Sequence, residues 1–247
     1  MNVQLSQSII MRTVEFGESD LIVSFFTRDK GRLKGIAKGA RRSRKRFVNC
    51  LDNFSLVEMD YKLNNKGALN FLNSARLIDT FPGIRSDYNI MSVASFMIEL
   101  IENLLPWELP DVLMFDLLIK TFSLLTHRKD IERVSIIFEM MAISIGGYGI
   151  NLDKCCTCGR EYKGEGISIF KPVKGGIACL KCECASAVSP ALSPLTVSAL
   201  KKIQSKSLEV FDKLYLSGEM ISEIRPLLKL HREYHLGRRL KTSCFLD

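Results

Sequence analysis

Two C-x-x-C pairs constrain the fold of this chain more than any other feature of its sequence. Cys155 and Cys158 form the first pair, Cys179 and Cys182 form the second, and 20 residues separate them. Four thiolates at this spacing can enclose one metal ion as a tetrahedron, with two sulfurs from each tight turn. Gly159 fits the left-handed position that ends such a turn. A Cys₄ set leaves no position for water, so we expect Zn²⁺ in a structural role, with iron in a rubredoxin-like site as the alternative.

Four further cysteines lie outside these pairs. Cys156 and Cys184 are surplus beside the metal ligands, and Cys184 could compete with Cys182. Cys50 and Cys244 stand alone, and we expect them to be buried thiols. The first residues, MNVQLSQSII, have no basic segment followed by a long apolar run, and no stretch approaches about 18 uncharged apolar residues. We therefore expect a cytoplasmic protein with no membrane partner and no disulfide framework.

A strongly basic stretch, GRLKGIAKGARRSRKRF, spans residues 31–47, and no Asp or Glu occurs between Lys30 and Asp52. Residues 1–80 hold 14 Lys and Arg against 8 Asp and Glu, whereas residues 81–247 hold 21 against 19. Cations at this density neutralise phosphates and release condensed counterions, which predicts a nucleic-acid-binding surface. The candidate contacts are Arg32, Lys34, Lys38, Arg41, Arg42, Arg44, Lys45 and Arg46. A solvated charged face or a disordered segment is the alternative interpretation.

Residues 3–80 have the pattern of a small β-domain. Strands are predicted at residues 3–14, 21–27, 32–38, 54–61 and 69–77. Gly31 lies where a hairpin connection favours a positive φ. Five short strands in this length favour a closed barrel, which removes exposed sheet edges. We predict a five-stranded barrel of the oligonucleotide-binding (OB) type, with an SH3-like barrel as the alternative.

Helical periodicity begins after Pro82-Gly83. Helices are predicted at residues 87–105, 111–126, 130–145, 195–205 and 222–240. Pro226 is compatible with the last of these if it falls in the first turn. The predicted fold class is therefore α+β, with three parts along the chain. They are an OB-fold DNA-binding domain at residues 1–80, an α-helical domain made of residues 81–150 and 190–247, and a zinc-binding module at residues 151–189 inserted into it.

Signals for catalysis are weak, and we expect no enzyme. His231 and His235 lie four apart in H-R-E-Y-H, which differs from the zinc-protease pattern because no Glu directly follows the first His. We interpret them as histidines satisfied within or between helices. Glu58 and Asp60 could start a Mg²⁺-dependent nuclease site, but no third carboxylate joins them, so a solvated strand face is the preferred interpretation.

The stretch FGESDLIVSFFTRDKGRLKGIAKGARRSRKRF closely resembles the N-terminal signature of the RecO family of bacterial recombination and repair mediators. The resemblance continues through CCTCG…GGIACLKC and YHLGRRLKTSCFL, in the same order and over almost the whole chain. After Phe47 the chain reads VNCLDNF, where the family more often has a Gly and a Gln-Pro before the Phe.

This resemblance implies an OB-fold barrel, a helical domain and often a Cys₄ zinc module. It implies binding of single- and double-stranded DNA and annealing of complementary strands. It also implies engagement of the acidic C-terminal tail of single-stranded DNA-binding protein and, with RecR and in some pathways RecF, help in loading RecA. By position the zinc ligands are Cys155, Cys158, Cys179 and Cys182, and the DNA face is formed by the eight cations named above. We place a basic rim for the tail at Arg128, Lys129 and Arg133.

A cationic loop that screens two phosphate backbones would let complementary strands approach each other without reading their bases. Phe25, Phe26 and Phe47 are aromatic groups that could stack on bases, although core packing is the preferred role of the first two. An RNA- or ribosome-associated barrel with a zinc ribbon is the alternative function.

Overall fold

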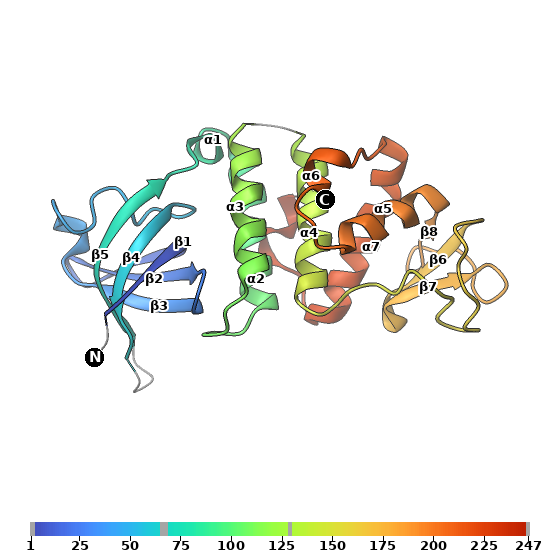
Figure 1. Ribbon diagram of the computed structural model, residues 1–247, viewed down its shortest axis with the longest axis horizontal. Coiled ribbons are helices and arrows are strands. Elements are labelled where there is room, and N and C mark those ends of the chain that lie inside the picture. The colour runs from blue at the N-terminus through green and yellow to red at the C-terminus, as the bar shows by residue number, and fades with distance from the viewer. Residues whose placement is uncertain (1–2, 65–68, 128–129, 246–247) are drawn as a thin grey trace. The chain divides into compact units, whose positions relative to one another are not determined.

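The computed structural model describes residues 3–64, 69–127 and 130–245, and its first part is a closed five-stranded barrel (Figure 1). The strands are β1 (Val3–Phe16), β2 (Asp20–Thr27), β3 (Gly31–Ala37), β4 (Leu56–Lys62) and β5 (Asn70–Asp79). Their order is β1-β2-β3-β5-β4, with β4 pairing back onto β1 and β3 running parallel to β5. The predicted OB-type barrel is therefore confirmed.

A bulge in β1 lets one long strand serve two neighbours. Residues 3–9 pair with β4, residues 8–16 pair with β2, and the register shifts between Ile10 and Arg12. Ile9, Ile10 and Met11 are all buried, although regular alternation would turn one of them outwards. A bulge bends and twists the strand locally, and this closes the barrel around the apolar run.

The outer face of β2 is buried as well as its inner face. Phe25 points into the barrel, where its ring lies 5.6 Å from the ring of Tyr61. Phe26 points outwards and lies 5.6 Å from the ring of Phe115 in α3 (Val112–Thr126). Both phenylalanines are fully buried, which confirms core packing as their role.

Contacts divide the chain into two compact units. The barrel unit comprises Met1–Ala94 and Leu105–Thr126, and the cysteine unit comprises Ser95–Leu104 and His127–Asp247. The short helix α1 (Pro82–Arg85) lies in the barrel unit, and α2 (Tyr88–Leu104) spans the division. This division assigns residues 105–126 to the barrel unit, whereas the sequence places them in the helical domain. The domain boundaries at residues 80, 150 and 189 stay predictions.

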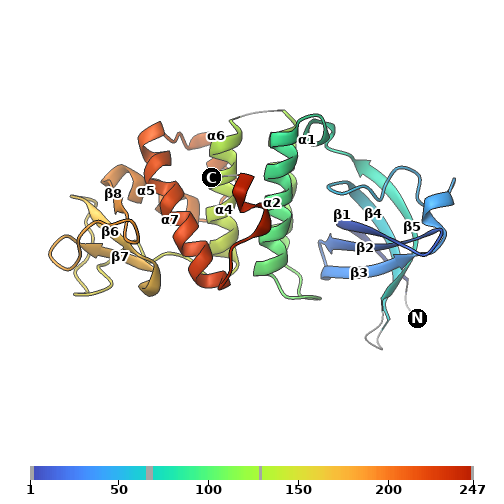
Figure 2. The same ribbon diagram turned by 180° about the vertical axis from the view of Figure 1, so that it is seen from behind.

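In the cysteine unit, helices from before and after the cysteines pack together. Figure 2 shows α4 (Ile131–Ile145), α5 (Pro194–Gln204) and α7 (Gly218–Leu236) side by side, and α4 also contacts α6 (Val210–Lys213). Between α4 and α5 in the chain, β6 (Ser168–Lys171), β7 (Gly176–Cys179) and β8 (Ala191–Leu192) form a small sheet in the order β7-β6-β8. Short 3₁₀ turns occur at Ala40–Arg42, Pro172–Lys174 and Lys241–Phe245. No helix within the described ranges is long and apolar enough to cross a membrane.

The start of α7 differs from the prediction. The helix begins at Gly218, so Pro226 lies in its interior and not in its first turn. Proline has no N–H to donate to the carbonyl of the residue four positions earlier, which is Ser222. Because Ser222 is exposed, water can hydrogen-bond to that carbonyl and the helix continues.

A strap of residues 105–109, just before α3, lies along the start of β3. The Glu108 N–H donates to the Arg32 carbonyl at 3.0 Å, and Trp107 forms a parallel bridge with Arg32. Gly31 has φ +70°, and its Cα faces the backbone of Leu109 so closely that an added Cβ would collide with it. The strap therefore requires glycine at position 31 for both its conformation and its size.

Substituting Gly31→Ala should destabilise the barrel unit more than Gly17→Ala. Both glycines have positive φ, which costs an L-residue about 1–2 kcal/mol. A Cβ at Gly17 would meet nothing within 4 Å, whereas one at Gly31 must displace Leu109. That overpacking should add about 1–3 kcal/mol. Urea unfolding followed through Trp107, the chain's one tryptophan, measures the difference, and equal losses in the two variants would contradict the close packing of the strap.

Candidate nucleic-acid interface and metal centre

The connection from β3 to β4 carries most of the predicted cations. We call residues 38–47 the basic loop; it leaves the barrel after Ala37 and turns through the 3₁₀ segment Ala40–Arg42. The exposed cations of the predicted set are Lys34, Lys38, Arg41, Arg42, Arg44, Lys45 and Arg46. Lys34 stands on β3 itself, next to the loop. The structure therefore brings seven of the eight predicted side chains to the surface of the barrel unit.

Arg32 is the exception, because its side chain is turned inwards under the strap. It is only 5% exposed, its Nη1 donates to the Leu105 carbonyl at 2.7 Å, and its guanidinium lies 4.2 Å from the centre of the Trp107 ring. A planar cation stacked on an aromatic ring and bonded to a backbone carbonyl holds a strap in place. In this structure Arg32 does not face solvent, and we leave it out of the DNA face proposed below.

The basic loop is held at several points. Phe47 is 5% exposed and belongs to the barrel core, so it cannot stack on a base. The Ala75 N–H donates to the Arg46 carbonyl at 2.9 Å, and Arg46 Nη2 donates to the Lys38 carbonyl at 2.6 Å. Gly39, with φ +67°, donates its N–H to Asp20 Oδ1 at 2.8 Å. The cations therefore project from a fixed backbone and not from a free tail.

Few acidic groups neutralise the loop. Arg41 Nη2 lies 3.2 Å from Glu15 Oε1, and the Arg41 side chain is still 40% exposed in this pair. Among the residues that the structure describes, Lys38, Arg42, Arg44 and Lys45 form no ion pair. An exposed ion pair such as Arg41–Glu15 is weak and is screened by salt, so it does not prevent Arg41 from binding a phosphate.

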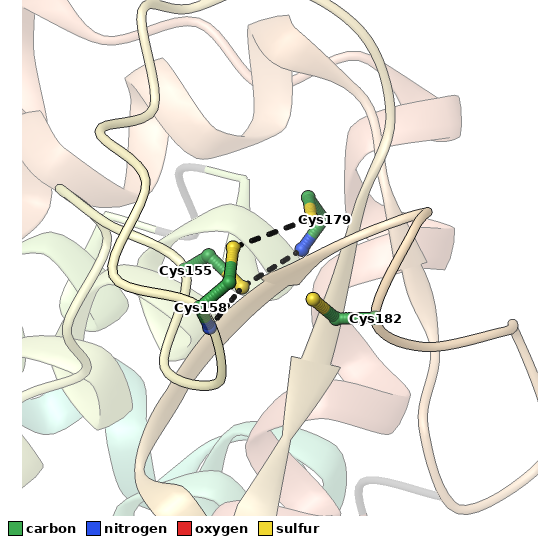
Figure 3. A group of neighbouring side chains, drawn as sticks. All are labelled: Cys155, Cys158, Cys179 and Cys182. Atoms are coloured by element: carbon green, nitrogen blue, oxygen red, sulfur yellow. Dashed lines mark hydrogen bonds between the residues drawn. The ribbon is translucent and has the colours of Figure 1, made fainter.

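The four predicted metal ligands meet in one place (Figure 3). Their Sγ atoms all lie within 4.8 Å of one another, and the Sγ atoms of Cys158 and Cys179 are 3.9 Å apart. Sulfurs at about 2.3 Å from a tetrahedral zinc would lie about 3.8 Å apart, so this spacing fits a metal tetrahedron. Gly159, with φ +74°, donates its N–H to the Cys155 carbonyl at 2.9 Å and closes the first turn. The Cys182 N–H closes the second turn on the Cys179 carbonyl at 2.9 Å.

The turn geometry also prepares Cys155 as a ligand. Burial raises the pKa of its thiol, but backbone N–H donors outweigh that effect and lower the pKa to about 6. Two of these donors are the N–H groups of Cys158 and Cys179, at 3.5 and 3.4 Å from the sulfur. A thiol with a lowered pKa is deprotonated near neutral pH, which is the form that binds metal. Because their sulfurs converge within 4.8 Å, the four cysteines can hold one metal ion.

The other cysteines have different surroundings. Within the described part of the chain, neither Cys156 nor Cys184 belongs to the group that could hold the metal. Cys50 is buried, as predicted, and burial raises its pKa to about 11. Cys244 is exposed, so the prediction of a buried thiol there was wrong. It lies in the C-terminal 3₁₀ turn Lys241–Phe245, which the periodicity of the sequence did not predict.

The residues considered for catalysis have structural partners. His231 is fully buried, and its Nε2 lies 2.7 Å from the Tyr148 carbonyl. Its Nδ1 and the Nε2 of His235 have no hydrogen-bond partner among the described residues, so the two histidines lie between elements as predicted but are only partly satisfied. Glu58 accepts from Arg76 at 2.9 Å, and Asp60 accepts from the Asn73 amide at 2.8 Å. These contacts fit the interpretation of a polar strand face.

Comparison with known proteins places the chain in a family. The family models for the N-terminal and C-terminal parts of recombination protein O match residues 1–81 and 85–243. The DNA repair protein RecO of Syntrophus aciditrophicus is 32% identical over 246 residues, covering 98% of this chain and 94% of that protein. The DNA repair protein RecO of Desulfatibacillum aliphaticivorans is 34% identical over 245 residues, covering 98% of this chain and 95% of that protein. The chain therefore belongs to the RecO family of DNA repair and recombination proteins.

Proposed function

We propose that this protein is a recombination mediator that binds single- and double-stranded DNA through its basic loop, anneals complementary strands and acts without catalysing a reaction. The observation that carries this proposal is the row of exposed cations on a backbone anchored to the barrel, with Glu15 as the one acidic partner found for them among the described residues. Contacts of Arg and Lys with phosphates position DNA and carry no sequence information. One loop can therefore serve any pair of complementary strands.

Annealing requires two polyanions to approach each other. Cations that project from one loop lower the repulsion between two phosphate backbones by replacing their condensed counterions. Arg42, Arg44 and Lys45 have no ion-pair partner in the described chain, so they bind phosphate without first breaking a contact. Arg41 exchanges Glu15 for phosphate, and Arg46 keeps its bond to the loop backbone. The loop thus combines free charges with a fixed shape.

The pathway partners belong to the same proposal. The protein helps load RecA onto DNA coated with single-stranded DNA-binding protein, and it works with RecR and, in some settings, RecF. These activities place it in the bacterial cytoplasm, in association with the nucleoid. An RNA- or ribosome-associated role is the alternative, because phosphate contacts alone do not distinguish RNA from DNA.

The acidic tail of single-stranded DNA-binding protein needs an apolar pocket with a basic rim. Arg128 and Lys129 lie outside the described residues. Arg133 is already engaged, because its Nη1 donates to the Phe211 and Leu214 carbonyls and its Nε contacts Asp130. The groove of about 160 Å³ between α4 and α7 offers apolar surface, but Glu132 and Glu139 also line it, and they pair with its Arg225 and Arg232. We therefore propose the tail as a partner without assigning it a site.

The metal is proposed to be zinc in a structural role. Four cysteine sulfurs within 4.8 Å match the ligand set that Zn²⁺ prefers, and a closed Cys₄ set leaves no position for a reacting water. Cys155, Cys158, Cys179 and Cys182 would hold it. When bound, the ion would supply cross-links between two turns of a small sheet that has little core of its own.

Replacing Arg42, Arg44 and Lys45 by Ala should weaken binding to all single-stranded sequences alike. Each phosphate contact on a single strand contributes roughly 0.7 to the slope of log K against log salt concentration, so the triple variant should flatten the slope by about 2. Fluorescence anisotropy with a labelled oligonucleotide, measured over a range of salt concentrations, gives the slope.

A matched control removes the same net charge from the cysteine unit. Lys163, Lys202 and Lys206 are exposed, and replacing them by Ala should leave the slope close to that of the unchanged protein. Equal slopes for both triple variants would refute the basic loop as the DNA site.

Competition between matched RNA and DNA oligonucleotides then tests the alternative, because a preference for RNA supports the ribosome-associated role.

Cys158→Ser or Cys182→Ser should lower the zinc content from about one ion per chain to nearly none, because three sulfurs do not complete the tetrahedron. The matched control, Cys184→Ser, removes a cysteine outside the group and should retain the ion. Elemental analysis of the purified proteins measures the content, and thermal unfolding should show a lower Tm when the ion is lost. Loss of zinc in the Cys184→Ser protein would show that the ligand set is different.

A further inference from the structure

A groove beside the basic loop has no role in the phosphate contacts described so far. It lies within the barrel unit and has a volume of about 760 Å³, which is within the range of about 300–1,000 Å³ typical of sites for small organic groups. One wall is β1, with Thr13 and Glu15, and the other is the connection of residues 43–54. Arg41 of the basic loop also lines it.

The second wall is fixed in place. Thr13 Oγ1 donates to the Leu51 carbonyl at 2.7 Å, and the Phe54 N–H donates to the Ile10 carbonyl at 2.7 Å. Phe47 is buried at the other end of the same segment, and Arg85 Nη2 donates to Ser55 Oγ at 2.9 Å. A groove whose walls are hydrogen-bonded to the barrel is ready to bind without an ordering cost.

The charges around the groove separate its rim from its interior. Arg42, Arg44 and Lys45, next to the lining residues Arg41 and Ser43, are exposed cations suited to phosphate. The lining itself holds Glu15 paired with Arg41, and Arg85 engaged with Ser55, so Asp52 is left as its one carboxylate without an ion pair among the described residues, and this group repels phosphate. Carboxylate and amide oxygens instead accept hydrogen bonds from the amino groups of cytosine, adenine and guanine. The lining therefore suits bases, and the rim suits the backbone.

Three residues of the wall carry side chains available to a base. Val48 is 49% exposed and lines the groove, where it offers an apolar surface to the flat face of a ring. Asn49 and Asp52 are exposed, and neither side chain has a hydrogen bond within the part of the chain that the structure describes. Asn49 has φ +49°, so the chain turns sharply at this point of the wall.

We infer that this groove holds unstacked bases of a single strand whose phosphates lie on the basic loop. The inference rests on the proposed function and specifies how the same site distinguishes its ligands. In a duplex the bases are stacked and paired, so their flat faces and pairing edges cannot enter the groove. In a single strand the bases can turn into the groove, and they must leave it when they pair with a complementary strand.

Val48→Trp gives a direct probe, because a base stacked on an indole quenches its fluorescence. The matched control is Val14→Trp, since Val14 is 53% exposed and points to the opposite side of β1 from Thr13 and Glu15. Each protein is saturated with an adenine-bearing oligonucleotide or with an abasic strand of equal length, and the signal of Trp107 is subtracted using the unchanged protein. Binding itself is followed separately by anisotropy of a label at the strand end.

We expect several-fold more quenching of the tryptophan at position 48 by the base-bearing strand than by the abasic strand, and no such difference at position 14. Equal quenching by both strands at position 48, with binding intact in anisotropy, would overturn the groove inference and leave the phosphate site standing. Failure of both strands to bind at low salt would overturn the proposed function and the inference with it.

A second variant avoids any effect of the larger side chain. Asp52→Ala removes an exposed group without a hydrogen-bond partner, so the fold should be unaffected. The ratio of its affinities for base-bearing and abasic strands should fall several-fold relative to the unchanged protein. Removing a negative charge strengthens binding of both strands alike, so the ratio of the two affinities reports only the contribution of the bases. An unchanged ratio would count against hydrogen bonding of bases in the groove.

Discussion

The arrangement of exposed cations on the barrel unit depends on one interaction, the burial of Phe47 in the barrel core. Phe47 is the last residue of the basic loop, and its burial forces the residues before it to run over the barrel. The hydrogen bond from the Ala75 N–H to the Arg46 carbonyl then attaches the end of the loop to β5. Removing a buried phenylalanine from a core costs about 3–5 kcal/mol, which is enough to hold cations that repel one another on one short loop.

A second constraint comes from the strap of residues 105–109. It covers the start of β3, so that two cations of the same strand face have different environments. Arg32 is enclosed under Trp107, whereas Lys34, two residues further along the same face, is exposed. The same packing joins α3 to the barrel through Phe26 and Phe115. The outer face of the second half of β2 is therefore part of a core.

The small sheet that carries the metal ligands depends on local geometry more than on a large core. Each C-x-x-C turn is closed by its own backbone hydrogen bond, and the small sheet brings the two turns together. Because four sulfurs converge from two loops, one bound ion would replace the apolar contacts that such a short segment lacks. The helices on either side of it in the chain pack directly on each other. The sheet is thus attached to a helical body that has a separate core.

The sequence alone determined the features that depend on near neighbours in the chain. Alternation predicted the five strands, helical periodicity predicted the principal helices to within a few residues, and the spacing of the cysteines identified the four ligands that the structure brings together. The side chains of Asp130 and Ser193 cap α4 and α5, which is a local feature of the same kind. The start of α7 was missed, although the Ser217 side chain caps it, because the helix was predicted to begin where Pro226 would fall in its first turn.

Only the tertiary structure decided which of the identified side chains face solvent. Arg32 and Arg42 are alike in the sequence, as are Cys50 and Cys244, yet in each pair one is buried and the other exposed. The groove beside the basic loop was equally hidden, because its walls come from β1 and from a connection some 40 residues further along the chain. Burial depends on segments distant in sequence, and no local pattern records which segment will cover a given side chain.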